Sequence, residues 1–230
     1  MKLETAKRWL ILFYEKIQEN LAVLAELDST MGGDGDHGEN MLRGMTAVVN
    51  TVEPKEFAST SDLFKETGML LLTKVGGVSG TLYDSAFLGM ARAEEAGDSL
   101  YYDIKEGLVM IQRRGRAEIG DKTMVDVWAP VVEDLKNHQL TPERIDEYIL
   151  KTALLRAKKG RHAYAADGSL GLVDPGSYSS GLLFKALSEK NILMCKVPLV
   201  EGAYTAASLL QAGVPFEAVI EQLREMDIDK

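Results

Sequence analysis

The sequence predicts an all-α fold, and three observations support that class. Apolar residues recur at three- and four-residue steps along most of the chain, the connections between these runs are short and polar, and strand signals are nearly absent. Only residues 192–200 have the apolar, β-branched character of a strand, and a single strand would have no partner. Helices joined by short turns pack as antiparallel neighbours, so we expect a bundle or barrel of amphipathic helices.

The first helix is the longest of the series. Its apolar side chains fall at three- and four-residue steps from Leu3 to Leu27, which trace one face of a single helix of about six turns. Thr141 and Pro142 form an N-cap and first-turn pair for a later helix. After the first, seven helices are expected in order at residues 40–50, 61–75, 81–96, 99–114, 123–137, 142–158 and 177–188.

Two shorter helical patterns follow Pro198, at residues 201–212 and 215–225. No linker rich in proline, glycine or serine and no internal repeat divides the chain. We therefore expect one helical domain, residues 1–188, and a C-terminal helical extension, residues 189–230, packed on it.

Composition and charge exclude several classes of protein. The 230 residues are 46% hydrophobic and 27% charged, and the single Cys195 excludes both an internal disulfide and a cysteine-based metal site. A net charge of -9 disfavours nucleic acid and anionic membranes as partners. Charges between Met1 and Arg8 oppose a signal peptide, and no apolar run is long enough to span a membrane. We expect a soluble cytoplasmic protein.

Four connections carry more glycine and polar residues than a turn requires. They are residues 32–40, 76–80, 115–123 and 161–176. Each follows an odd-numbered helix of the predicted series, and alternate loops of an up-and-down arrangement lie at the same end. Helix counting therefore predicts that all four loops meet at one rim.

Familiar nucleotide and calcium motifs in these loops are excluded by their context. The glycine spacing of residues 33–38 matches the dinucleotide fingerprint, but that fingerprint follows a strand, whereas here a long helix precedes it. Residues 115–123 resemble a P-loop with Asp121 inserted, and they also lack the leading strand. An EF-hand beginning at Asp34 would need a glutamate at its twelfth position, which is absent.

The first of these loops suits a hard cation beside a phosphate. Asp28, Asp34 and Asp36 fall within nine residues, and carboxylate oxygens are the ligands that magnesium and calcium prefer. Gly38 to Asn40 lie at a predicted helix N-terminus, where phosphate is favoured. Acids and phosphate in one loop require a metal between them. The alternative is an ordinary Asx-type turn, since aspartate and glycine are common turn formers.

The stretch GDGDHGENM at residues 33–41, with Arg43 and Gly44 after it, resembles the signature of the nucleotide-binding L subunit of dihydroxyacetone kinase, the DAK2 domain family. The resemblance spans residues 1–188 and implies a barrel of eight antiparallel helices with the nucleotide at one rim. Three further stretches agree in order, namely GGVSG at 76–80, GDKTM at 120–124 followed by Asp126-Val127-Trp128, and KGR at 159–161 leading to Asp174-Pro175-Gly176.

The resemblance implies roles for particular residues. Asp28, Asp34 and Asp36 would hold two magnesium ions that bridge the phosphates of ADP or ATP. It identifies no catalytic residue on this chain. The implied nucleotide contacts are His37, Gly38, Glu39 and Asn40 at the phosphates and ribose, Val78 and Ser79 against the nucleotide, Gly115, Thr123 and Met124 on the adenine side, and Asp174, Pro175 and Gly176 in the closing loop.

The implied function is that of one subunit of a phosphotransferase. In this family a histidine of a separate K-type subunit holds the ketose, and a separate L chain is typical of the phosphotransferase-system type. There ADP stays bound, and a phosphohistidine carrier, the M-type subunit, rephosphorylates it. A homodimer is left open. Two other functions also stay open, an ADP-binding regulator or adaptor without turnover and a kinase subunit for another ketose such as erythrulose.

Four features depart from the family pattern. After GGVSG the chain continues as Thr81-Leu82-Tyr83-Asp84, where proline and glycine are commoner in the family. The spacing from Asp28 to Asp34 is one residue longer, so one of the intervening glycines must bulge out or Asp28 is displaced. Gly168 stands where the family has an arginine that reaches the phosphates. Residues 189–230 have no counterpart in compact members of the family, and we expect them to extend the packing of the barrel.

Overall fold

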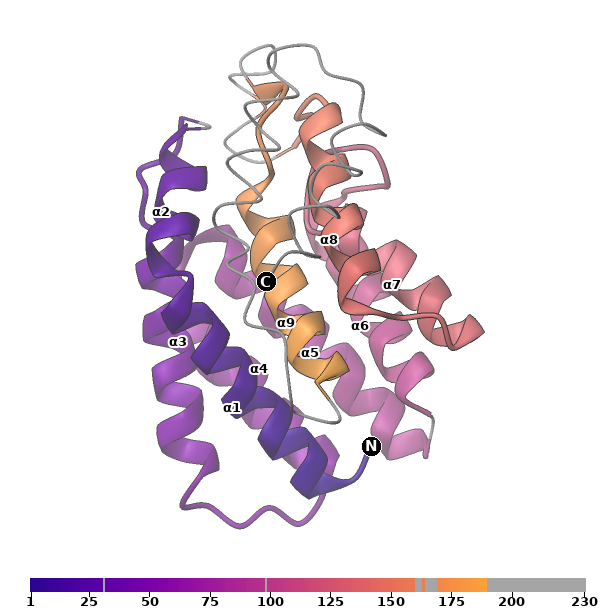
Figure 1. Ribbon diagram of the computed structural model, residues 1–230. Coiled ribbons are helices and arrows are strands. Elements are labelled where there is room, and N and C mark those ends of the chain that lie inside the picture. Colours follow the sequence, from indigo (N-terminus) through magenta and orange to yellow (C-terminus); the bar gives the residue numbers. More distant parts are fainter. Residues whose placement is uncertain (31, 98, 160–162, 164–168, 190–230) are drawn as a thin grey trace, which may run out of the picture.

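The computed structural model describes residues 1–30, 32–97, 99–159, 163 and 169–189. Within these residues every regular element is a helix, so the predicted all-α class is confirmed (Figure 1). The elements are α1 (Leu3–Glu19), α2 (Leu21–Thr30), α3 (His37–Val52), α4 (Thr60–Lys74), α5 (Gly77–Ala96), α6 (Leu100–Gly115), α7 (Val125–Asn137), α8 (Pro142–Lys151), the short 3-10 helix η1 (Thr152–Leu154) and α9 (Pro175–Ser188).

The helices close into a ring. α1 packs against α3, each helix from α3 to α8 packs against the next one along the chain, and α9 returns to α1. α2 follows α1 at the same edge of the ring and lies beside α3 and α9 (Figure 1). Eight helices of the described chain therefore form the wall, which confirms the predicted barrel of antiparallel helices.

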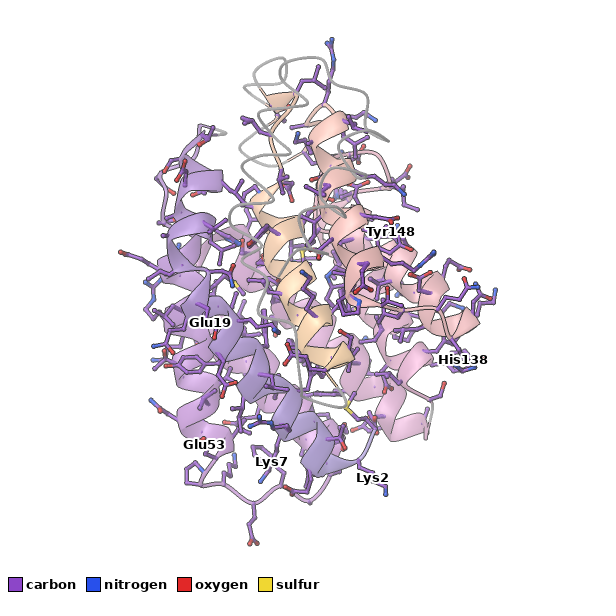
Figure 2. The ribbon with its side chains drawn as sticks, viewed as in Figure 1. Lys2, Lys7, Glu19, Glu53, His138 and Tyr148 are labelled. Carbon is purple, nitrogen blue, oxygen red and sulfur yellow. The ribbon has the colours of Figure 1, made fainter. Side chains whose placement is uncertain are left out.

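The wall is amphipathic, as the apolar periodicity predicts. The rings of Trp9, Phe64 and Phe87 lie in the interior with their centres 5.8–6.2 Å apart. Charged side chains such as Glu19 and Glu53 point outward (Figure 2). Burial of each phenylalanine contributes about 1.5–3 kcal/mol, so packing of the apolar faces holds the barrel together more than helix propensity does.

The prediction of one continuous helix from Leu3 to Leu27 is wrong, because the chain bends at Asn20. The Asn20 backbone has φ -109° and ψ 17°, and its N–H donates to the carbonyl oxygens of Lys16 and Ile17. Its side-chain amide also donates to Lys16 O at 2.8 Å. An asparagine side chain competes with the backbone for hydrogen bonds, and that competition leaves no mark on the spacing of apolar residues.

Several other helix boundaries differ from the prediction in a consistent direction. α3, α5 and α9 begin two to four residues before the expected Asn40, Thr81 and Ser177, since their first turns contain the glycine or proline that the prediction assigned to loops. The helix predicted to reach Lys158 ends near Leu154 instead. The Lys158 N–H donates to Asp121 O at 3.1 Å, so the tertiary structure takes the backbone group that would have continued the helix.

α9 ends at Ser188, the last residue of the predicted helical domain. The predicted extension from residue 190 onward, the strand-like segment 192–200 and Gly168 all lie outside the described residues. Among the helices that are described, none combines the length and apolar character needed to cross a membrane.

Candidate functional site

The four polar loops meet at one end of the barrel, the upper end in Figure 1, where each contributes to a single pocket. This is the arrangement that helix counting predicts. The pocket encloses a cavity of about 140 Å³ and is open to solvent on one side. Its lining consists of Asp28, Asp36, His37, Asn40, Gly76, Gly77, Val78, Ser79, Leu82, Tyr83, Lys122, Thr123, Met124, Lys159, Asp174, Pro175 and Gly176.

Four helix N-termini surround this pocket. His37 and Gly77 are the first residues of α3 and α5, Pro175 is the first residue of α9, and Met124 precedes α7. The first N–H groups of a helix have no acceptor inside it, and the helix dipole makes this end positive. The alternating direction of the helices thus gives the rim a positive field and a set of N–H donors, which favour an anion such as phosphate.

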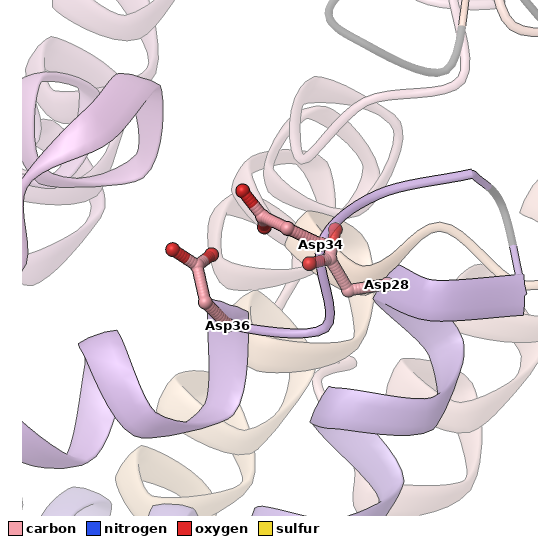
Figure 3. Close-up of side chains that lie close together, drawn as sticks. All are labelled: Asp28, Asp34 and Asp36. Atoms are coloured by element: carbon pink, nitrogen blue, oxygen red, sulfur yellow. The ribbon is translucent and has the colours of Figure 1, made fainter.

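Three carboxylates lie at the edge of the same pocket. Asp28, Asp34 and Asp36 each offer an oxygen, and these oxygens lie within 4.8 Å of one another (Figure 3). Asp28 is buried near the end of α2, Asp34 is exposed, and Asp36 precedes the first residue of α3. Oxygen ligands this close together fit a hard divalent cation.

The longer spacing between Asp28 and Asp34 does not displace Asp28. The Gly33 N–H donates to Asp28 O at 2.8 Å and the Gly32 N–H donates to Ser29 O at 3.0 Å, the pair of bonds that defines a Schellman motif at the end of α2. Gly32 takes the left-handed conformation that this motif requires, with φ 83°. The additional residue is absorbed in the helix end, and Asp28 stays beside the other two carboxylates.

His37 begins a chain of hydrogen bonds that runs from the pocket into the core. Its Nδ1 lies 3.3 Å from the Ser79 hydroxyl and its Nε2 lies 3.1 Å from the Ser179 hydroxyl. Ser179 also lies 2.9 Å from the hydroxyl of Tyr83, which is buried, and burial raises the pKa of Tyr83 to about 12. The imidazole is therefore held at both nitrogens, which fixes its orientation toward the pocket.

Asp126 organises the third loop. Its carboxylate accepts hydrogen bonds from the N–H groups of Gly120 at 2.5 Å and Thr123 at 2.8 Å. Burial raises the pKa of this carboxyl, and the two backbone donors oppose that shift. These bonds hold Thr123 and Met124 at the pocket wall.

Most of the residues predicted to contact the nucleotide line this pocket, but three do not. Gly38 packs against α2 instead, since a Cβ there would lie 2.6 Å from Leu21 O. Glu39 is exposed in the first turn of α3. Gly115 ends α6 and packs against Leu82, which lines the pocket in its place.

Leu82, Tyr83, Lys122 and Lys159 line the pocket although the sequence reasoning gave them no role. Lys122 stands inside the quoted GDKTM stretch, so its position was a usable signal. Tyr83 resembles any apolar position of an amphipathic helix, and nothing in the sequence separates it from the core.

The comparisons with known proteins agree with this geometry. A model of the DAK2 domain matches residues 31–189. The chain is similar to the ADP-binding subunit DhaL of PEP-dependent dihydroxyacetone kinase 1 from Listeria innocua, with 44% identity over 191 residues that cover 81% of this chain and 96% of that protein. It is equally similar to the ADP-binding subunit DhaL of PTS-dependent dihydroxyacetone kinase from Lactococcus lactis, with 44% identity over 82% of this chain and 98% of that one.

The fold is similar to that of the dihydroxyacetone kinase of Citrobacter freundii in its native form. The TM-score is 0.69 at 24% identity, over 81% of this chain and 34% of that one. This likeness supports the helical barrel, and the family match together with the 44% identical relatives confirms the resemblance noted in the sequence. The chain therefore belongs to the DAK2 domain family.

Proposed function

We propose that this chain is the nucleotide-binding subunit of a dihydroxyacetone kinase. It holds ADP with magnesium, and a phosphohistidine carrier transfers its phosphoryl group to this ADP to give bound ATP. The terminal phosphoryl group of that ATP then passes to a ketose carried by a partner K-type subunit, which leaves ADP bound. The relatives from Listeria innocua and Lactococcus lactis are named as ADP-binding subunits of PEP- and PTS-dependent kinases, which supports this assignment.

One observation carries the proposal. A three-carboxylate cluster and four helix N-termini meet in one pocket, and only a ligand with both signs of charge satisfies them together. A magnesium-bound nucleotide diphosphate has that chemistry, since the cation faces the acids and the phosphates face the N–H groups. An anion alone would be repelled by the three aspartates.

The donor set fits magnesium. Asp28, Asp34 and Asp36 supply hard oxygen ligands, and the phosphates and water supply the remaining ligands that magnesium prefers over an all-protein cage. We propose two ions at this cluster. When bound, magnesium supplies the neutralisation of phosphate charge on which phosphoryl transfer depends.

The other pocket residues bind and orient the nucleotide. The N–H groups at the starts of α3 and α5 face the phosphates, and His37 adds a ring held by Ser79 and Ser179. Thr123 and Met124 form the adenine wall, and Asp174 to Gly176 line the pocket beside them. Positioning and charge neutralisation supply most of the catalysis in this reaction class, so no nucleophile on this chain is required.

The proposal extends to the wider organisation of the system. A K-type subunit and a phosphohistidine carrier are the partners, the barrel of residues 1–188 is the nucleotide-binding unit, and the subunit works in the cytoplasm. Gly38 and Glu39 contribute through the backbone at the start of α3, and Gly115 contributes through its packing on Leu82.

The first experiment looks for the nucleotide itself. The purified chain is denatured, and the released small molecules are separated by anion exchange and assayed for magnesium. We expect ADP and magnesium. Calorimetric titration of ADP into a chelator-stripped sample should then show binding only when magnesium is restored, and absence of binding under both conditions would contradict the proposal.

A second experiment separates the kinase subunit from a regulator without turnover. The ADP-loaded chain is mixed with a phosphorylated histidine carrier and a K-type subunit from a DhaL-containing system, with dihydroxyacetone or erythrulose as substrate. Formation of the ketose phosphate supports the kinase, and the preferred ketose identifies the substrate. ADP binding without any transfer would favour the adaptor.

A further inference from the structure

Lys122 is the one buried lysine of the described pocket lining, and its ammonium group is directed at the protein itself. The side chain is 1% exposed. Its Nζ donates to Ser169 O at 2.5 Å, to Leu172 O at 2.6 Å and to Leu155 O at 3.0 Å. A lysine ammonium has three donors, so these three carbonyl oxygens use all of them.

These acceptors come from both ends of the segment that joins η1 to α9, residues 155–174, which includes most of the fourth loop. Leu155 follows η1, whereas Ser169 and Leu172 precede α9. Two backbone bonds reinforce the same junction, from Lys158 N–H to Asp121 O at 3.1 Å and from Gly171 N–H to Ala153 O at 2.7 Å. The third loop therefore joins the two ends of this segment through the ammonium group of Lys122.

The backbone at Lys122 is itself constrained. Its φ is 59°, in the left-handed region that a residue with a Cβ seldom occupies. This conformation costs on the order of 1 kcal/mol and persists where the surroundings over-determine it. In this conformation the side chain is buried and its ammonium reaches all three carbonyl oxygens.

The junction lies directly behind two walls of the pocket. Leu172 is two residues before Asp174, whose carboxylate accepts from the Ser177 N–H at 2.7 Å and caps α9. The Ser177 hydroxyl in turn donates to Thr123 O at 2.8 Å. Lys122 and Ser177 thus tie the wall formed by Thr123 to the wall formed by Asp174.

We propose that Lys122 is a positioning residue whose ammonium clamps the fourth loop to the third and so sets the separation of the two pocket walls, without donating to the nucleotide. This inference rests on the proposed function, because the pocket it shapes is the nucleotide pocket. Lys122 cannot bind a phosphate as well, since all three of its donors are engaged within the protein.

Protonation of the clamp gives it a pH dependence. Burial lowers the pKa of Lys122 to about 8, while the charges of Asp174 and Asp126 oppose that shift. The other charges at this junction, Asp121 and Lys158, face each other at 3.6 Å. Above pH 8 a neutral amine offers two donors to three carbonyls, so one carbonyl is released and affinity for the nucleotide falls.

The effect of rising pH on the free energy of unfolding has the opposite sign to its effect on ADP affinity. Because the folded pKa lies below the ordinary value of 10.5, the unfolded chain binds more protons between pH 8 and 10.5. The contribution of Lys122 to the free energy of unfolding therefore rises over this interval while the affinity for ADP falls. A residue with a merely structural role would not separate these two quantities.

The test compares wild type with Lys122→Met, Lys122→Arg and the control Lys185→Met. Lys185 is also buried, but it pairs with Asp146 at 2.6 Å on α9 and α8, outside the pocket lining. Titration of ADP with magnesium should show affinity about tenfold lower in Lys122→Met, with partial recovery in Lys122→Arg. Lys185→Met should lower the melting temperature and leave the affinity unchanged.

A second measurement follows the ligand-free chain, as wild type and as Lys122→Met. Amide hydrogen exchange at Lys158 and Gly171, corrected for the intrinsic rate, should accelerate between pH 7 and 9, and Lys122→Met should exchange rapidly at both values. Equal ADP affinity and equal amide exchange in wild type and Lys122→Met would contradict the positioning role of Lys122 and leave the proposed function standing. Failure of wild type to bind ADP would instead contradict the proposed function, so the two failures are distinguishable.

Discussion

The buried aspartate Asp134 and the three aspartates at the rim lie at different places on the barrel and differ in how their charge is balanced. Near the C-terminal end of α7, Asp134 is buried and accepts from Arg144 Nη2 at 2.6 Å, from Arg144 Nε at 2.7 Å and from the Tyr148 hydroxyl at 2.7 Å. His138 follows that end of the helix, away from the rim (Figure 2). At the rim, by contrast, Asp28, Asp34 and Asp36 are gathered within 4.8 Å of one another.

Asp134 therefore stabilises the fold, whereas the aspartates at the rim are arranged to bind a cation. Asp134 is neutralised within the chain, and burial together with this hydrogen bond raises the pKa of Tyr148 to about 12. Gathering like charges at the rim costs roughly 1–3 kcal/mol per pair at the separations involved. A bound cation offsets that cost. The three aspartates therefore lower the stability of the ligand-free chain, and ligand binding restores it.

The largest expected effect comes from removing charge at each of these places in turn. Asp34→Asn with Asp36→Asn should weaken magnesium-dependent ADP binding by about 100-fold or more, because the metal loses charge that water cannot replace. The same change should raise the melting temperature of the ligand-free chain slightly.

Asp134→Asn should lower the melting temperature by roughly 5 °C without changing ADP affinity. Calorimetric titration and thermal melting check both, and similar behaviour of the two variants would contradict the comparison.

A smaller effect should follow from displacing one carboxylate without changing any charge. A Cβ at Gly33 would lie 2.3 Å from Asp28 Oδ1, so Gly33→Ala must push the Asp28 side chain away. We expect the magnesium concentration for half-maximal ADP binding to rise about tenfold. Gly97→Ala is the control, since its φ of 79° makes the substitution strained while no atom lies within 4 Å of the new Cβ. It should affect stability alone, and an equal loss of binding would contradict the role of Asp28.

The hydrogen-bond chain behind His37 predicts a more modest change. Ser179→Ala removes the partner of His37 Nε2 and one partner of the Tyr83 hydroxyl. ADP affinity should fall about threefold to tenfold, with a loss of about 1–2 kcal/mol in the free energy of unfolding. Ser188→Ala, at the other end of α9, removes only a bond to Lys185 O and should leave the affinity intact. Titration of both variants decides whether the chain of bonds positions the imidazole.

The smallest effect is expected from truncation. The pocket residues in the described part of the chain lie between Asp28 and Gly176, so we expect a chain that ends at Glu189 to bind ADP with magnesium within about twofold of the full chain. Calorimetric titration of ADP with magnesium into the truncated chain and into the full chain checks this. A large loss of affinity would show that residues 190–230 belong to the nucleotide site.

Much of this architecture could be read from periodicity and order. The apolar steps identify the helices of the wall, and helix counting places the four polar loops at one rim. The errors have local causes, since Asn20 bends the first helix through its own side chain and Lys158 leaves its helix for a bond to Asp121. Neither event alters the apolar pattern, so neither is visible in it.

The sequence by itself determined the helical class, the rim and the three carboxylates, because these depend on residue type and spacing along one chain. Only the tertiary structure decided how the site is shaped. The Schellman motif that keeps Asp28 in register, the buried bonds of His37 and the clamp at Lys122 join residues far apart in the chain. Such contacts depend on how the helices close into a ring, which no local pattern encodes.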